Sequence, residues 1–245
     1  MVVRKRSTGA LSLLLAGAGT LQVAASAQRW WPACRPGDFH TAACLRLQSH
    51  TYDFVVPSAP WVPVGHASVL AGHSLLLLGL AETGLPLLLR PGRRPVLAWL
   101  LCAALGLSQL LAGVSTVASG LLGRAVGELG TPFVAFVLLG WPVALTLTSI
   151  LMVGRVRRPA AGWLLLIVLL TASTPVVELF MAPIVTGYAS YDTTPWSEAW
   201  GGACLLLASL AVWPAAYRRR RRPAPATARA PATTPAAGAA LVGRP

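Results

Sequence analysis

The stretch that decides the fold is residues 96–123, VLAWLLCAALGLSQLLAGVSTVASGLLG, which contains no charged side chain. A helix needs about 20 consecutive apolar residues to cross a hydrocarbon core of roughly 30 Å. This stretch exceeds that length, and Arg94 and Arg124 stand just beyond its two ends. It therefore predicts a membrane-spanning helix rather than a segment of a soluble domain.

Five further apolar segments have the same character, and Glu82 and Glu178 are the only acids within them away from a segment's first residue. The six predicted helices cover residues 8–28, 66–89, 96–119, 131–153, 160–182 and 198–217. The expected fold class is therefore all-α, a polytopic membrane bundle of six helices within residues 1–217. The one sizeable loop, at 29–65, is too small to be an independent domain without a covalent staple.

The composition supports a membrane protein and argues against nucleic-acid binding. Hydrophobic residues make up 55% of the chain and charged residues only 11%, whereas about a quarter of the residues of a soluble domain are charged. The net charge of +13 comes from short basic clusters between the apolar segments, a distribution typical of membrane topology. Lys5 is the only lysine beside many arginines, alanines and prolines, as in proteins encoded by GC-rich bacterial genomes.

The orientation follows from the arginines and lysines in alternate connections. One side carries Arg4, Lys5, Arg6, Arg90, Arg93, Arg94, Arg155, Arg157, Arg158 and Arg218 to Arg222. The opposite side carries Arg29, Arg35, Arg46 and Arg124, together with the acids Asp38, Asp53, Glu128, Asp192 and Glu198. The first side is expected to be cytoplasmic, which places both termini in the cytoplasm of a protein of the plasma membrane.

The chain after the last helix has two parts, a basic run and a polar tail. Arg218, Arg219, Arg220, Arg221 and Arg222 stop the helix and are expected to contact anionic lipid at the cytoplasmic face. Beyond them the tail is rich in Pro, Ala, Thr and Gly and poor in large apolar residues, so residues 218–245 are expected to be disordered.

The first segment allows a second interpretation. Arg4-Lys5-Arg6, an apolar run and Ala25-Ser26-Ala27 also resemble a cleavable signal peptide. Cleavage would leave five helices and an extracytoplasmic N-terminus. Because polytopic bacterial proteins usually keep their first helix, six helices is the preferred count.

Two of the four cysteines fall in the 29–65 loop. Cys34 and Cys44 are expected to form a structural disulfide, since an extracytoplasmic compartment permits one and closing so short a loop contributes about 2–3 kcal/mol. Cys102 and Cys204 lie within helices near opposite faces of the membrane and are expected to be packing residues.

The four histidines all fall in this loop or in the outer half of the second helix. His40, His50 and His66, with nearby Asp38 and Asp53, offer imidazole and carboxylate groups that suit zinc. Their spacing matches no known ligand pattern. The alternative is that His40 and His50 are hydrogen-bonding loop residues and His66 is an interfacial residue, so no metal and no cofactor is assigned.

Four polar residues within the predicted membrane segments stand out: His73, Glu82, Glu178 and Gln109. A charged side chain at that depth costs a few kcal/mol, so such residues face the bundle interior, pair with a partner or carry no charge. Glu82 lies about 12 Å from the cytoplasmic boundary by helical rise. His73 and Glu178 lie at similar depth in the outer half and could pair. Alternatively, Glu178 reaches the external interface near Tyr188.

Packing signals are clearer than chemical ones. Small residues recur every four positions in helix one (Thr8, Ser12, Ala16, Thr20, Ala24) and in helix three (Ala104, Ser108, Ala112, Thr116, Gly120). Such ridges let helix backbones approach closely. Pro142 and Pro175 predict kinks in helices four and five. Tyr52-Asp53 before Pro60-Trp61 is echoed by Tyr191-Asp192 before Pro195-Trp196, which indicates two interfacial anchors or a duplicated unit.

Three functions remain open. The first is a non-enzymatic accessory or binding component that presents the stapled loop, with a membrane-protein partner or a second copy of itself. The second is a small proton-linked transporter that uses Glu178, Glu82 and His73. The third is a membrane enzyme with a site formed by His40, His50, Asp38 and Asp53 at the outer face. No phosphate-binding loop, dinucleotide fingerprint or hydrolase motif occurs in the sequence.

Overall fold

The computed structural model describes residues 2–88, 96–126, 140–153, 161–190 and 192–216. These residues form helices and loops and contain no strand. The long helices are α1 (Val2–Trp30), α3 (Ala67–Gly84), α4 (Val96–Leu122) and α9 (Ser197–Ala216). The shorter ones are α6 (Trp141–Val153), α7 (Ala161–Ala172), α8 (Pro175–Thr186), α2 (Ala42–Leu47) and two 3-10 turns, η1 (His50–Tyr52) and η2 (Leu85–Leu88).

Four of these helices are long and apolar enough to cross a membrane. They are α1, α3 extended by η2, α4 and α9, and the bent pair α7 and α8 makes up to five spans if it counts as one. The fold is therefore an all-helical bundle with four or five membrane-length helices among the described residues. The predicted helix at 131–153 lies partly outside these residues, and its described part, α6, is too short to cross alone.

The fifth predicted helix, 160–182, is not one straight span. It divides into α7 and α8, which meet at an angle of 85°. Pro175 is the first residue of α8, so the predicted interruption is confirmed, but it is a break rather than a mild kink. Pro142 is the second residue of α6. Residues 127–139 before it lie outside the description, so the kink at Pro142 stays a prediction.

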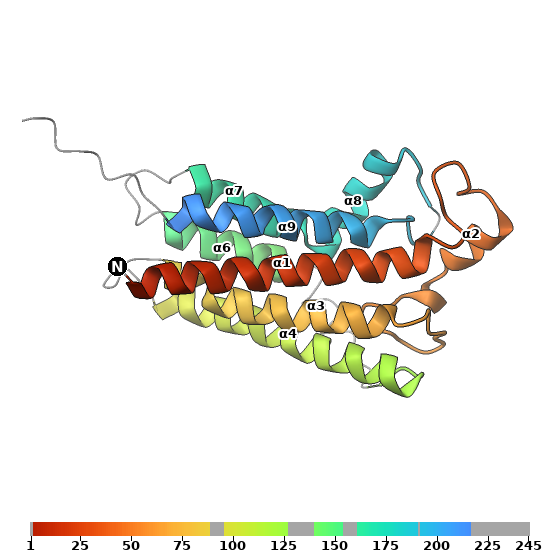
Figure 1. Ribbon diagram of the computed structural model, residues 1–245, viewed down its shortest axis with the longest axis horizontal. Helices are drawn as coiled ribbons and strands as arrows, with labels where there is room; N and C mark the ends of the chain where they lie inside the picture. The colour runs from red at the N-terminus through yellow and green to blue at the C-terminus, as the bar shows by residue number, and fades with distance from the viewer. Residues whose placement is uncertain (1, 89–95, 127–139, 154–160, 191, 217–245) are drawn as a thin grey trace, which may run out of the picture.

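The helices close into a ring around one apolar core. Contacts follow the order α1, α3, α4, α6, α7, α9 and back to α1. The core contains Leu15, Leu78, Leu105, Leu166 and Val212, one large side chain from each of five helices. Figure 1 shows α1, α3, α4 and α9 running lengthwise, whereas α6 lies in the half that holds the N-terminus and α8 projects near the opposite end.

The closest helix approaches run through glycines. A Cβ on Gly79 would lie 2.6 Å from the carbonyl oxygen of Gly106, and one on Gly72 would lie 2.8 Å from that of Gly113. Between α1 and α9, a Cβ on Gly19 would lie 2.6 Å from the carbonyl oxygen of Gly202. Without a hydrophobic drive inside lipid, such backbone contact is a main source of helix association.

The predicted ridges of small residues coincide with these seams only in part. On α4, Ser108, Ala112 and Thr116 are buried but Ala104 is exposed. On α1, Thr8 is buried and Thr20 is exposed. A strict four-residue spacing drifts about 40° per step around a helix of 3.6 residues per turn, so it leaves the contact face within a few turns.

Both chain ends of the described bundle lie at the same end. Ser12 of α1 bonds the carbonyl of Ser209, and Trp30 bonds Glu198, so α1 and α9 are antiparallel neighbours. The other end is covered by what we call the cap, residues 31–65 and 187–196, of which residue 191 is outside the description. Residues 218–245, including Arg218 to Arg222 and the tail, also lie outside the described residues, as do Arg90, Arg155 and Glu128.

Candidate functional site in the cap

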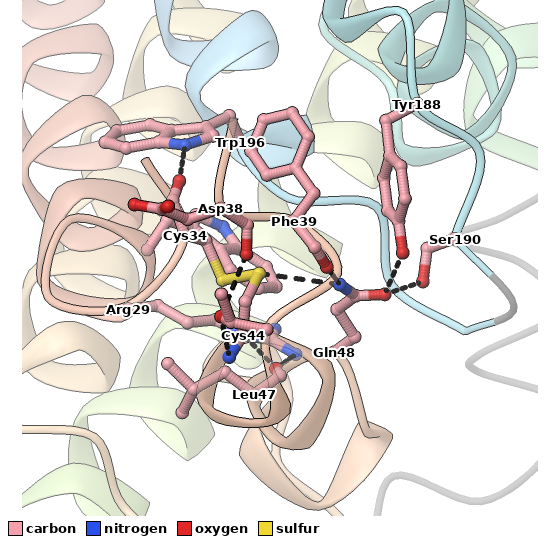
Figure 2. Close-up of a disulfide and its surroundings, with 12 residues drawn as sticks. Arg29, Cys34, Asp38, Phe39, Cys44, Leu47, Gln48, Tyr188, Ser190 and Trp196 are labelled. Carbon is pink, nitrogen blue, oxygen red and sulfur yellow. Dashed lines mark hydrogen bonds between the residues drawn. A yellow bond between two sulfur atoms is a disulfide. The ribbon is translucent and has the colours of Figure 1, made fainter. Parts of the chain in front are cut away.

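A disulfide anchors the first half of the cap. Cys34 and Cys44 are bonded, with Cα atoms 4.9 Å apart, and both are fully buried. The predicted disulfide is therefore present in the structure (Figure 2). Short α2 begins beside it, because the Thr41 hydroxyl accepts a hydrogen bond from the Cys44 amide and caps the first turn. The cap thus has an ordered nucleus, since the buried cysteines pack with Trp30, Phe39 and Leu47 in a small apolar cluster.

Gln48 joins the two halves of the cap. Its Nε2 donates to the carbonyl of Phe39 at 3.1 Å, and its Oε1 accepts from Tyr188 at 3.2 Å and from Ser190 at 2.7 Å. The backbone carbonyl of Gln48 also accepts from the amide of Thr193. Figure 2 shows this amide between the disulfide and the segment that leads into α9. One side chain therefore connects segments more than a hundred residues apart.

Arg29, at the end of α1, is the centre of the site. Its side chain is fully buried and lies 2.7 Å from Oδ1 of Asp53 and 3.3 Å from Oε1 of Glu198. Its remaining N–H groups donate to the carbonyls of Leu47 and Ser49. The guanidinium is planar and carries five donors, so it can bind several acceptors at once. It fixes the cap to the first turn of α9.

The acceptors around Arg29 are themselves held in place. Oε2 of Glu198 accepts from the Trp30 indole at 2.7 Å, and Oδ1 of Asp53 accepts from the Thr193 hydroxyl at 3.1 Å. The guanidinium also lies 4.2 Å from the centre of the Trp30 ring, a favourable cation–π position. Burying an ion is costly unless its charge and donors are satisfied, and this network satisfies them.

His50 extends the network to the surface. Nδ1 lies 2.8 Å from Oδ2 of Asp53 and Nε2 lies 2.6 Å from Oδ1 of Asp192, while its amide donates to Oδ2 of Asp192. The aspartates of the two Tyr-Asp pairs therefore converge on one imidazole. The result is a continuous chain, Glu198, Arg29, Asp53, His50 and Asp192, which we call the ionic chain.

The other histidines of the cap lie apart from this chain. The His40 ring packs edge-on against Tyr188 with ring centres 5.1 Å apart. His66 is exposed at the start of α3, where its amide donates to Oε1 of Gln28. Within the described residues no three His, Cys, Asp or Glu side chains have an arrangement that could hold a metal ion. The three histidines proposed as metal ligands are thus not brought together.

Two of the polar residues predicted within the membrane have different surroundings from those expected. His73 is exposed on the surface of the bundle, and its Nδ1 lies 2.7 Å from the carbonyl oxygen of Val69. Of the two alternatives for Glu178, the pairing with His73 is not formed, because Glu178 lies on α8 against Gly201 of α9. The side chain of Glu178 is half-buried there.

The other two, Glu82 and Gln109, face the interior. Glu82 is buried, and its Oε1 accepts from the Trp141 indole at 3.1 Å. Its Oε2 and the Nε2 of Gln109 have no hydrogen-bond partner among the described residues. These groups share the seam between α3 and α4, since a Cβ on Gly79, one turn before Glu82, would lie 3.0 Å from Cβ of Gln109.

Sequence reasoning missed the most connected residues of the site. The sequence placed Arg29, Glu198 and Asp53 on the same side of the membrane, but it indicated a role only for Asp53, as a possible metal or enzyme residue. Gln48 and Trp30 were not singled out at all. The sequence does contain a signal for Arg29. This arginine stands directly at the end of an apolar segment, and the preceding turn, Ser26-Ala27-Gln28, contains no acid that could pair with it.

Comparison of the chain with protein families, curated proteins and solved structures finds no match to any of them.

Proposed function

We propose that this protein is a non-enzymatic membrane component whose cap binds a partner outside the membrane. The observation that carries the proposal is the buried pairing of Arg29 with Asp53 and Glu198, which locks the cap to α1 and α9. A surface loop of this size is ordinarily mobile. Here the disulfide, Gln48 and the ionic chain hold it in one conformation.

A surface held in one conformation before binding loses less entropy when a partner docks. The cap also exposes three large apolar side chains, Trp31, Leu45 and Val62. Trp31 is oriented by an edge-on contact with Trp196, with ring centres 6.0 Å apart, and by Arg35 above its ring. Exposed aromatic and arginine side chains on a rigid support are typical of protein-binding surfaces.

The arrangement of His50 favours binding over catalysis at the cap. A general base or metal ligand needs a free ring nitrogen. Each ring nitrogen of His50 instead faces a carboxylate, Asp53 on one side and Asp192 on the other. His50 therefore serves as a clasp between two segments of the cap rather than as a general base.

We also propose the placement of the chain in the plasma membrane of a bacterium, with six spans and both termini in the cytoplasm. Two observations support this placement. The arginine-rich connections fall on the same predicted side of the membrane as the two termini. The disulfide lies at the opposite end of the bundle, and disulfides persist in oxidising compartments. In this placement the cap lies outside, and the run Arg218 to Arg222 contacts anionic lipid inside.

A second candidate, proton-linked transport, is favoured by one observation. Glu82 is a buried carboxyl with Trp141 as its donor, and Gln109 nearby offers an unpaired amide. Interior carboxyls often mark proton pathways. Of the three residues that the sequence suggested for transport, only Glu82 lies in the interior, because His73 is on the surface and Glu178 is near the cap.

Photo-crosslinking in native membranes tests the binding function. With benzoylphenylalanine at Leu45, and separately at Val62, illumination is expected to give an adduct of one defined mass. The same residue at Leu107, an exposed position on α4, should not give that adduct. Replacing both Cys34 and Cys44 by alanine frees the cap and is expected to reduce the adduct several-fold.

Two results would overturn this proposal. One is that neither cap position yields an adduct. The other is that the adduct persists unchanged without the disulfide, because a partner would then not depend on the ordered cap. A pH-driven flux through reconstituted vesicles that Glu82→Gln abolishes would in turn establish the transport candidate.

A further inference from the structure

The carbonyls at the end of α7 are hydrogen-bonded across the break between α7 and α8. The last carbonyls of α7 belong to Leu170, Thr171 and Ala172, and they accept from the side chains of Ser173, Thr174 and Trp200 respectively. In a membrane, non-helical backbone is tolerated only where its polar groups are satisfied again. The break therefore forms a stable corner rather than a frayed helix end.

Contacts with α9 give the depth of this corner. Gly162, near the start of α7, lies against Pro214 and Ala215, whereas Ala172, at its end, accepts from Trp200. Trp200 is three residues from Ser197, where α9 begins, which is about 5 Å by helical rise. Helix α8 thus starts close to the end of the bundle that carries the cap, not in its middle.

One side of α8 has no protein partner in the described structure. Leu179, Phe180 and Ile184 lie on this side and are 62%, 67% and 72% exposed. Glu178, the only charged residue of α8, faces the other way, because a Cβ on Gly201 would collide with its carboxylate. On α7, Leu164, Leu165 and Val168 are exposed as well.

Pro183 limits how deep this helix can lie. Proline has no N–H, so the carbonyl of Leu179, one turn earlier, lacks its helical donor. In the hydrocarbon core such a carbonyl costs several kcal/mol unless a neighbouring group supplies a donor. At the boundary, water and headgroups can supply the donor. The proline therefore favours the interface, where the apolar side can still reach acyl chains.

The end of α8 is attached to the cap. Gly187 closes the helix in the left-handed conformation, with φ of 65°, which glycine adopts without strain. The next residue, Tyr188, donates its hydroxyl to Gln48. Tyrosine is enriched at membrane interfaces, where its ring is apolar and its hydroxyl is solvated. The helix thus runs from the corner at Pro175 to the polar cap.

We propose that α8 is an in-plane helix that binds the membrane leaflet adjacent to the cap, through Leu179, Phe180 and Ile184. The fifth of the six proposed spans then ends at the corner before Pro175. Its ligand is the acyl-chain region of that leaflet. Because α8 carries no lysine or arginine, the contact does not depend on anionic headgroups. It supports the cap at the membrane surface, since Tyr188 follows directly and is bonded to Gln48.

Spin labelling tests this contact in the full-length protein. A nitroxide is attached at Phe180→Cys, with the buried thiols of Cys102 and Cys204 replaced by alanine, in phosphatidylcholine vesicles. The nitroxide should collide more often with oxygen, which concentrates in lipid, than with a water-soluble nickel chelate. A label at Leu107→Cys should behave likewise, and one at Leu45→Cys, on α2, should show the reverse. Adding anionic lipid should leave the Phe180 ratio unchanged.

Three results would overturn the proposal. Greater access to nickel than to oxygen at Phe180 would place α8 in water. Shielding from both reagents, relieved by dilution with unlabelled protein, would show that a second copy covers the helix. Shielding that dilution does not relieve would show that another protein segment covers it. Ile184→Cys provides the same measurement if Phe180→Cys does not fold.

Discussion

Replacing Arg29 by methionine is expected to destabilise the protein by about 3–5 kcal/mol, the cost of removing one partner from a buried ion pair. Methionine keeps most of the volume, so the loss is electrostatic rather than a cavity effect. Asp53 and Glu198 would then face each other without the cation that lies within 3.3 Å of both. Thermal unfolding in detergent, followed with the disulfide intact, measures the change.

Two further variants separate the pairing from the loss of an arginine. Arg46→Met removes an exposed charge of α2 and is expected to change stability by less than about 0.5 kcal/mol. In the Arg29→Met background, Glu198→Gln removes the unpaired carboxylate and should recover part of the loss, because a neutral amide is cheaper to bury. An Arg29→Met protein as stable as Arg46→Met would contradict the assignment.

Gly106→Ala is expected to be the most damaging single-methyl change in the bundle. A Cβ there would lie 2.5 Å from the carbonyl oxygen of Gly79 and would collide with the hydroxyl of Thr83. Overpacking usually costs about 1–3 kcal/mol. The upper end is expected, since the carbonyl belongs to the backbone of α3 and can move only if the helices separate. The readout is the midpoint of thermal unfolding.

Gly9→Ala is the matched control for this change. Gly9 also lies within a membrane-length helix, but a Cβ there meets nothing within 4 Å. Alanine is favoured over glycine in a helix by about 1 kcal/mol, so this variant should be neutral or slightly stabilising. Equal effects at Gly9 and Gly106 would show that the contact between α3 and α4 is not as close as described.

The long helices could be predicted from the sequence because their signal is local. Uninterrupted apolar length predicts α1, α3, α4 and α9, and the structure has membrane-length helices at those places. The disulfide was predictable for a similar reason, since Cys34 and Cys44 are near in sequence and share one loop. The count of six spans is not established by the described residues.

The corner at Pro175 and the ionic chain could not be predicted because their causes are distant in sequence. Pro175 indicates an interruption, but the 85° angle also depends on Trp200, which satisfies the end of α7 from another helix. Arg29 and Glu198 are 169 residues apart, and a charge count treats each as a separate loop residue. The sequence also did not indicate that Gly106 and Gly113 form the close contact between α3 and α4, because they are seven residues apart and the pattern considered had a spacing of four.

The most direct test of the central claim, that the cap is held in one conformation, is amide hydrogen exchange of the intact protein in lipid. Residues 42–53 include α2, η1 and the two residues, Leu47 and Ser49, whose carbonyls accept from Arg29. If the cap is ordered, the amides of residues 42–53 should exchange about as slowly as those at the cap-side end of α1. Exchange at the rate of an unstructured chain would contradict it, and the proposed binding function would then lose its support.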